Sequence, residues 1–382
     1  MEAIVVQKYG GSSVADPDKL GIVADRVAAT VRSGRRVVVV VSAMGKTTDE
    51  LLALARRVTA EPPRRELDML LSTGERISMA LLAMALEARG HSAISFTGSQ
   101  SGILTNDRHS GARIIEVRPV RIEDELDRGK VVIVAGFQGM SYKREITTLG
   151  RGGSDTTAVA LAAALGADCE IYSDVDGVYS ADPRVVADAA RLARIGYEEM
   201  QELAEHGAKV LNAQAVEWAR KAQVTIHARA TSGSAAETRI GPPASSASAA
   251  PTEQRGARAV TGSKDVISLA GGAGVLGILA EERVSVRHAC GACVRLIVSD
   301  VPDWPRVVRR LAAAGAAVAR VGEVTVVGPG VNEPSVIERA CAAAGVPLLG
   351  WEAAPLRLTL LVEGGHVDAV TRALHAALCA VS

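Results

Sequence analysis

Apolar strand-like runs alternate with longer helical stretches over the first 240 residues, and this alternation constrains the fold most strongly. The runs lie at residues 3–8, 37–42, 93–96, 131–135, 168–173 and 224–228. Most of the intervening stretches are amphipathic or rich in alanine, as helices are. Because parallel strands need crossovers that place helices on both faces, the pattern predicts a mostly parallel α/β sheet sandwiched by helices.

The last third of the chain has a different pattern. Residues 241–259 are rich in Pro, Ser and Ala without an apolar period, which predicts a linker. Strand-like and helical runs alternate more closely over 260–382, and they fit two small strand–helix–strand–strand–helix units. We therefore predict a domain over 1–240, a linker over 241–259 and a pair of small α+β units over 260–382.

Composition narrows the classes of function. The 382 residues include 43 basic and 43 acidic side chains, so no basic excess indicates a nucleic acid or membrane partner. The longest aliphatic run, Val37–Val41, is far too short to span a bilayer, and we find no signal peptide. Five scattered cysteines are typical of a reduced, cytoplasmic protein.

The stretch VVQKYGGSSVADPDKL, near the amino terminus, joins a strand to a helix. Asp16 and Pro17 are typical of a helix start, so Lys8, Gly10 and Gly11 fall at the turn between the two elements. Bare backbone N–H groups at a helix start, beside a lysine, can bind an anion. An ordinary tight turn with a solvated lysine fits these residues equally well.

Two further segments favour the anion-binding interpretation. The stretch TLGRGGSDTTAVALAAALGA, residues 148–167, places three glycines and Arg151 before an Ala-rich helix that Ser154 or Asp155 can cap. The stretch YSDVDGVYSADPR, residues 172–184, follows a strand at the edge where open α/β sheets bind ligands, although it also fits a polar surface loop. Neither glycine loop has the spacing of a dinucleotide or P-loop motif.

Taken in order, these motifs resemble those of the aspartate kinases, which have the amino acid kinase fold. The resemblance extends over residues 1–230 and includes KYGGSS, STGERIS, TTLGRGGSD, YSDVDGVYSADPR and GAKVL. It weakens over 260–382, where the family carries two ACT domains of the ferredoxin type. The resemblance implies ATP-dependent phosphorylation of the β-carboxylate of L-aspartate to 4-phospho-L-aspartate and ADP, the first step towards lysine, threonine and methionine.

The resemblance also implies a role for individual residues. Lys8 would contact the transferring phosphoryl group, and Asp155 would orient both Lys8 and Lys209. Aspartate would be bound by Glu75 at its α-ammonium and by Arg151 at a carboxylate, in a pocket that Thr47 and Ser154 also line. The predicted ATP-binding residues are Lys8, Gly10, Gly11, Ser12, Ser42, Ser173, Asp174, Tyr179, Asp182 and Arg184.

The chemistry agrees with this set of side chains. The attacking β-carboxylate is already ionised at neutral pH, so the reaction needs no general base. Phosphoryl transfer then depends on positioning and on positive charge from lysines, backbone N–H groups and Mg²⁺. We assign no metal ligands among the side chains. The pair Cys290 and Cys293, beside His288, lacks the second ligand pair of a zinc site.

The sequence departs from the family pattern at several positions. Lys46 stands beside Thr47, where many relatives have an acidic residue, and Asn212-Ala213 replaces a His-Pro or an apolar–basic pair. In the predicted ACT region, residues 271–274 and 287–293 differ from the usual effector-binding stretches. We therefore expect a degraded site for lysine or threonine, with the region retained to assemble a homo-oligomer.

Two alternative functions remain open. The same fold and mechanism could act on an aspartate analogue in a specialised pathway, which Lys46 and the altered tail would suit. A catalytically inactive regulatory subunit is less consistent with the sequence, because Lys8, Glu75, Arg151 and Asp155 are all present.

Overall fold

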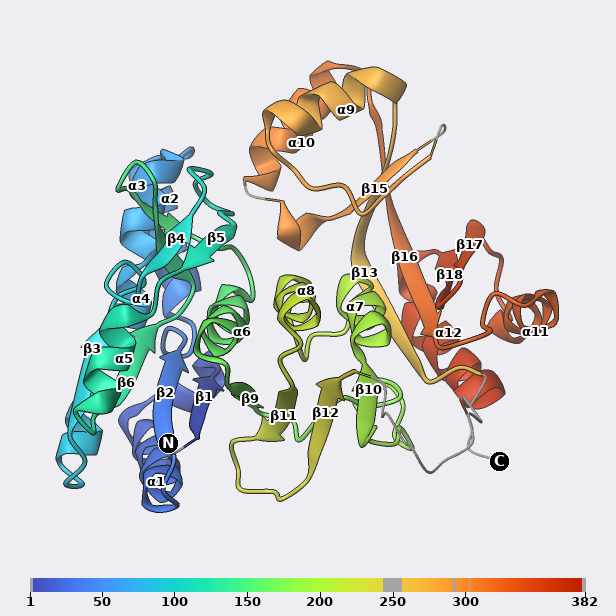
Figure 1. Cartoon of the computed structure of the whole chain (residues 1–382). Helices are drawn as coiled ribbons and strands as arrows, with labels where there is room; N and C mark the ends of the chain where they lie inside the picture. Colours follow the sequence, from blue (N-terminus) through green and yellow to red (C-terminus); the bar gives the residue numbers. More distant parts are fainter. Residues whose placement is uncertain (1–2, 243–255, 291–292, 302, 380–382) are drawn as a thin grey trace. The chain divides into compact units, whose positions relative to one another are not determined.

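The computed structural model of the chain consists of two compact units (Figure 1). The described residues are 3–242, 256–290, 293–301 and 303–379. The first unit contains Met1–Val178, Ala193–Tyr197 and Val210–Pro243. The second unit contains Tyr179–Leu192, Glu198–Lys209 and Ala244–Ser382.

The predicted linker lies largely outside the described residues, because 243–255 are not among them. The flanking strands end at Gly241 and begin at Ala259. The predicted domain limits at 240 and 260 stay predictions.

An eight-stranded sheet forms the centre of the first unit. Its strands are parallel except where β11 pairs with β12. In spatial order the strands are β10 (Arg194–Gly196), β12 (Glu237–Gly241), β11 (Ile226–Ala230), β9 (Asp168–Ser173), β1 (Ile4–Tyr9), β2 (Arg36–Val41), β6 (Val131–Ala135) and β3 (Ala93–Phe96). All six runs predicted from the sequence are strands of this sheet, which confirms the predicted α/β fold class.

Alternate residues of the central strands face opposite layers of helices. Val5 and Val39 pack against α1 (Pro17–Arg32) and α4 (Thr73–Glu87), in a core that contains Leu82. On the other face lie α6 (Gly153–Leu165) and α8 (Ala213–Ala222), which pack against each other (Figure 1). Because side chains alternate along a strand, Lys8 faces α6, whereas Val5 faces α1.

A smaller four-stranded sheet extends the first unit. The sequence does not predict this sheet, because its strands are only three or four residues long and carry several polar residues. Its order is β5 (Ile114–Val117), β4 (Ile103–Thr105), β7 (Gln138–Ser141) and β8 (Ile146–Thr148). The neighbouring helices of the unit are α2 (Thr47–Val58), α3 (Arg64–Leu71) and α5 (Val120–Asp127).

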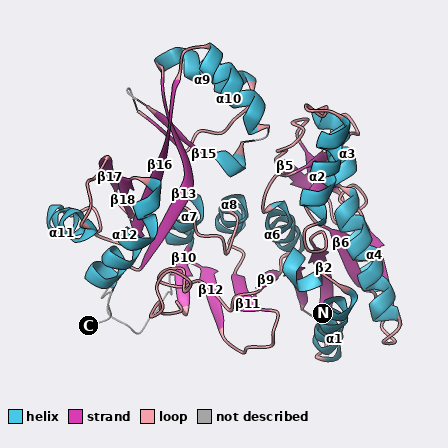
Figure 2. Cartoon of the chain, turned by 180° about the vertical axis from the view of Figure 1, so that it is seen from behind, coloured by secondary structure: helices cyan, strands magenta, loops and turns pink. Residues whose placement is uncertain are grey.

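Two long antiparallel strands, β13 (Ala259–Ala270) and β16 (Ala317–Val327), run through the second unit (Figure 2). One half of this strand pair carries α9 (Gly272–Glu281), β14 (His288–Ala289), β15 (Val294–Ile297) and α10 (Trp304–Ala313). The other half carries α11 (Pro334–Ala344), β17 (Gly350–Ala354), β18 (Arg357–Val362) and α12 (Val367–Leu374). The helix α7 (Tyr197–Glu205) belongs mostly to this unit as well.

Each half of the second unit has its own apolar core, one around Leu311 and the other around Leu374. The mixed α+β architecture agrees with the ACT-like fold that we predicted. The two halves share β13 and β16, however, so the second half takes its first strand from a segment that precedes the first half. The sheet is curled, since His288 on β14 contacts Glu352 on β17 at 3.0 Å although these strands end the strand order.

Residues Arg64–Glu87, which form α3 and α4, are long and apolar enough to cross a membrane by composition alone. In the structure this segment contributes buried residues such as Leu82 and Leu86 to the core of the first unit. That role is typical of a core helix.

We predict that Leu82→Ala destabilises the first unit by about 2–5 kcal/mol, because it removes a fully buried side chain and leaves a cavity. Met84→Ala, two residues further along the same helix, is the matched control because Met84 is 64% exposed. Urea unfolding followed by circular dichroism should show a lower midpoint for Leu82→Ala only. Equal midpoints for the two variants would contradict the assigned packing of α4.

Candidate active site

The carboxyl ends of four parallel strands meet at one edge of the large sheet. The first residues after these strands are Gly10 after β1, Ser42 after β2, Gly136 after β6 and Asp174 after β9. This edge, where loops can converge without blocking the strands, is the usual ligand site of an open α/β sheet.

An ion pair joins the central strand of this edge to α6. Lys8 Nζ lies 2.7 Å from Asp155 Oδ1, and the two side chains are only 11% and 10% exposed. Asp155 stands in the first turn of α6, where the helix dipole favours negative charge. The predicted contact between Asp155 and Lys8 is thus present in the structure.

The loop after β1 lies directly against the loop after β2. Gly45 N donates to Gly11 O at 3.0 Å, and a Cβ atom on Gly11 would lie only 2.8 Å from Ala43 O. Only glycine fits this close approach of two backbones. Gly10, Gly11 and Ser12 therefore form a compact turn beside Lys8, and Ser12 is exposed at its surface.

Glu75 brings a buried carboxylate to the same loops. It lies in the first turn of α4, is 3% exposed, and accepts a hydrogen bond at Oε1 from Ala43 N at 3.1 Å. Its Oε2 has no hydrogen-bond partner among the described residues. Burial raises the pKa of Glu75 to about 7. A buried, unpartnered carboxylate oxygen is costly, so its place in a ligand site is the simplest explanation.

The other predicted substrate residues lie on neighbouring elements of the first unit. Thr47 begins α2 and lies beside the start of α4, since a Cβ atom on Gly74 would be 3.6 Å from Thr47 Cγ2. Ser154 is buried at the start of α6, against Gly136. Arg151 is exposed, and its guanidinium has no partner among the described side chains. It is thus a free cation at the loop before α6.

The predicted ATP-binding residues fall into two groups. Ser42 follows β2, Ser173 ends β9 and Asp174 follows it, so these residues lie at the ligand edge with the turn at Gly10–Ser12. Ser173 Oγ donates to Val175 O at 3.1 Å, which fixes the start of this loop, and Asp174 is exposed.

Tyr179, Asp182, Arg184 and Lys209 belong to the second unit. Arg184 Nη2 lies 2.7 Å from Asp182 Oδ2, and this pairing lowers the pKa of Asp182. Lys209 is exposed. The roles of these four residues stay predictions.

A buried aspartate that the sequence motifs do not include connects elements beside the site. Asp68 on α3 is fully buried and accepts hydrogen bonds from Thr148 Oγ1 at 2.5 Å and from Ser110 N at 3.1 Å. His109 Nδ1 lies 2.7 Å from its other oxygen. Asp68 thus connects α3 to the strand that leads into the Arg151 loop. The sequence feature that could have identified Asp68 is its position between leucines on the buried side of α3.

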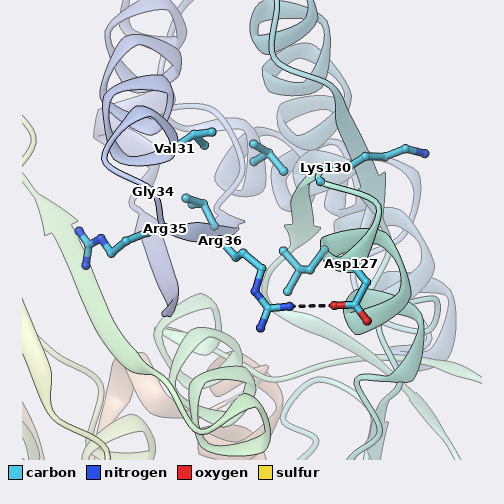
Figure 3. A pocket seen from close by; sticks show the side chains of 10 residues that line it. Val31, Gly34, Arg35, Arg36, Asp127 and Lys130 are labelled. Atoms are coloured by element: carbon cyan, nitrogen blue, oxygen red, sulfur yellow. Dashed lines mark hydrogen bonds and ion pairs between the residues drawn. The ribbon is translucent and has the colours of Figure 1, made fainter. Parts of the chain in front are cut away.

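The described residues also form a hollow of about 490 Å³ at the opposite end of the sheet (Figure 3). Its lining comes from the amino ends of β2 and β6, and Arg36 pairs there with Asp127 at 2.8 Å. Because the strands of the predicted site end at the other edge, this hollow is separate from the site.

Side chains that could bind a metal ion together are few among the described residues. Over the described part of the chain, no group of three or more His, Cys, Asp or Glu side chains could hold a metal ion. Cys290 and Cys293 lie with their sulfur atoms 3.4 Å apart and offer two ligands only.

Comparison with known proteins assigns the family. The sequence model of the amino acid kinase family matches residues 3–229. An aspartokinase of Mycolicibacterium smegmatis is 43% identical, over 98% of this chain and 96% of the relative. The chain belongs to the aspartokinases of the amino acid kinase family. An aspartokinase of Corynebacterium efficiens is 60% identical over 60% of this chain and 55% of its own length.

Solved aspartokinase structures share the fold. The crystal structure of Escherichia coli aspartokinase III in complex with aspartate and ADP has a TM-score of 0.84 and 25% identity, and the match covers 98% of this chain and 99% of that one. The same enzyme in complex with lysine and aspartate matches over the same shares with a TM-score of 0.71. The family resemblance seen in the sequence is therefore confirmed.

We predict that Glu75→Gln stabilises the ligand-free protein above pH 7. The pKa of Glu75 is raised from 4.5 to about 7 in the fold, so its ionisation destabilises the folded state as the pH rises from 4.5 to 7. Removing that charge should raise the free energy of unfolding by about 1–3 kcal/mol at pH 8.

The gain of Glu75→Gln should vanish below pH 4.5, where the carboxyl group is protonated in both states. Glu50→Gln, on the exposed face of α2, is the matched control and should change little. Chemical denaturation at pH 8 and pH 4 measures both variants. A loss of stability at pH 8 in Glu75→Gln would contradict the unpartnered state of this carboxylate.

Proposed function

We propose that the protein transfers the γ-phosphoryl group of ATP to the β-carboxylate of L-aspartate, giving 4-phospho-L-aspartate and ADP. The observation that carries this proposal is the juxtaposition of the Lys8–Asp155 pair with the buried, unpartnered Glu75 around the ligand edge of one sheet. Aspartate and ADP, which are bound in the related Escherichia coli enzyme, are the ligands that this site would take.

The nucleotide would be bound through its phosphates at the turn after β1. Gly10, Gly11 and Ser12 present backbone and a hydroxyl group there, and Lys8 provides a full positive charge beside them. Ser42, Ser173 and Asp174 border the same edge. On the family resemblance alone, we assign Tyr179, Asp182 and Arg184 to ATP binding as well, and Lys209 to catalysis together with Lys8. Asp155 keeps the Lys8 ammonium aimed at the phosphoryl group that is transferred.

Aspartate would be held by its two ends that do not react. The free Oε2 of Glu75 suits the α-ammonium group, and the unpartnered guanidinium of Arg151 suits a carboxylate, to which it can bind with two parallel hydrogen bonds. Thr47 and Ser154 line the pocket between them. These contacts orient the β-carboxylate for in-line attack.

The attack needs no proton transfer, because the β-carboxylate is ionised at neutral pH. The role of the chain is to place its oxygen near the γ-phosphorus and to offset the charge that accumulates on the phosphoryl oxygens. Mg²⁺ would arrive with the nucleotide and supply further positive charge. The exposed carboxylate of Asp174 is at the appropriate edge to face it.

A hydroxylamine-trapping assay tests the proposal. With ATP and Mg²⁺, L-aspartate should yield a hydroxamate, and glutamate should not. An aspartate analogue is a second candidate substrate, because exposed Lys46 adds a charge next to Thr47. Rapid turnover of an analogue without aspartate turnover would favour that candidate, and failure with all these acids would favour a non-catalytic subunit.

We further propose that the second unit assembles a cytoplasmic homo-oligomer and responds weakly to amino-acid effectors. Open edges of small sheets favour pairing between chains. Lysine is bound in one Escherichia coli structure. In this chain, however, residues 271–274 and 287–293 depart from the effector-binding stretches, so feedback by lysine or threonine should be weak.

We predict that Lys8→Ala lowers kcat by about two orders of magnitude or more, since the charge of Lys8 matters most as the phosphoryl group transfers. The KM values should change much less. Lys19→Ala, on the exposed side of α1, is the matched control. Steady-state kinetics with each substrate varied in turn will show whether kcat falls in Lys8→Ala alone, and an unchanged kcat would remove Lys8 from the reaction.

We predict that kcat/KM for aspartate falls as the pH is lowered through about 7. The pKa of Glu75 in the free enzyme is about 7, and the protonated carboxyl group cannot pair with an ammonium ion. In Glu75→Gln, KM should be raised and this step in the pH profile should disappear. Persistence of the step in that variant would assign it to another group.

A further inference from the structure

Asn212 is one of the positions at which the sequence departs from the family motif, and its side chain lies against the loop that carries Arg151. This loop, the Arg151 loop, consists of Gly150, Arg151 and Gly152. Asn212 Nδ2 donates a hydrogen bond to Arg151 O at 2.8 Å. Both residues belong to the first unit.

The other end of the amide is occupied as well. Asn212 Oδ1 accepts from Gln214 N at 2.8 Å and from Thr156 Oγ1 at 3.3 Å, and Asn212 is the N-cap of α8. Because a backbone N–H can only donate, the amide oxygen must face Gln214, which leaves the amide nitrogen to face Arg151 O. The side chain therefore has two separate roles, one at each end.

The Arg151 loop is built to receive this amide. Gly152 has φ +69°, a left-handed conformation that favours glycine, and a Cβ atom there would lie 2.6 Å from Asn212 Nδ2. The amide thus packs on bare backbone. The Arg151 guanidinium itself has no partner among the described side chains, so its position is set by the backbone of this loop.

We propose that Asn212 is a positioning residue that holds the Arg151 loop in the conformation that binds the substrate carboxylate. The inference rests on the proposed function for the role of Arg151 in binding aspartate. Fixing the loop before the ligand arrives reduces the ordering that binding requires. Without the amide nitrogen, α8 keeps its cap but no longer holds the loop.

Three substitutions separate the two roles. Asn212→Ser and Asn212→Asp retain an oxygen that can cap α8, and both lose the hydrogen bond to Arg151 O. Asn212→Ala loses the cap as well. Asn212→Asp adds a negative charge and Asn212→Ser does not, so an effect seen equally in both variants comes from the lost donor. The thermal midpoints of both variants should match that of the unaltered protein.

The kinetic readout is a split between KM and kcat. In Asn212→Ser and Asn212→Asp, the KM for aspartate should rise about five- to tenfold, as expected for one lost hydrogen bond. The kcat and the KM for ATP should stay within about twofold, because Lys8 and its surroundings are unaltered. An unchanged aspartate KM in an active enzyme would overturn the role in substrate binding.

Limited trypsin digestion of the ligand-free full chain tests the loop itself, independently of activity. Cleavage after the exposed Arg151 should be about threefold faster or more in both variants, measured by mass spectrometry against cleavage after Lys143. Unchanged cleavage would overturn the inference. If the variants are cleaved faster but the unaltered protein phosphorylates no acid, the loop contact is supported and the proposed function is overturned.

Discussion

The ion pair between Lys8 and Asp155 is the interaction on which the site depends. Two nearly buried charges 2.7 Å apart are stable only as a pair, since removing one leaves the other uncompensated, at a typical cost of about 3–5 kcal/mol. The pair requires Lys8 to face α6 and α6 to begin at the end of β1. The ion pair therefore forms only if the alternation of side chains along β1, the two glycine loops and the start of α6 are all in the arrangement described.

Two charged side chains near this pair, Glu75 and Arg151, have polar atoms without hydrogen-bond partners among the described residues. Glu75 keeps one buried oxygen without a partner, and Arg151 has a guanidinium with no partner among the described side chains, so both retain interactions for a ligand. Two neighbouring polar side chains are hydrogen-bonded at both ends instead: Asp68 accepts at both carboxylate oxygens, and Asn212 uses both its amide oxygen and its amide nitrogen. Hydrogen bonds thus stabilise the elements beside the site, whereas the two side chains that would bind the ligand keep polar groups without partners in the described part of the chain.

The sequence was most informative where one local pattern determines the structure. The continuous apolar run Val37–Val41 is typical of a strand buried on both faces, and it lies between two parallel neighbours in the sheet. Asp16-Pro17 starts α1 as predicted. The short polar strands β4 and β8 were not predictable, because only pairing with distant segments makes them strands. The contact of Lys8 with Asp155 came from the family resemblance, and the contact of Asn212 with Arg151 depends on the packing of α6 on α8, which no local pattern encodes.

A double-mutant cycle between Lys8 and Asp155, read in kcat, tests most directly whether these residues act as one unit. If Asp155 acts on kcat only through Lys8, and its predicted contact with Lys209 adds nothing, the double variant Lys8→Ala, Asp155→Ala should be no slower than Lys8→Ala alone. Reductions in kcat that multiply, so that the double variant loses the product of the two single losses, would contradict the account and give Asp155 a separate role.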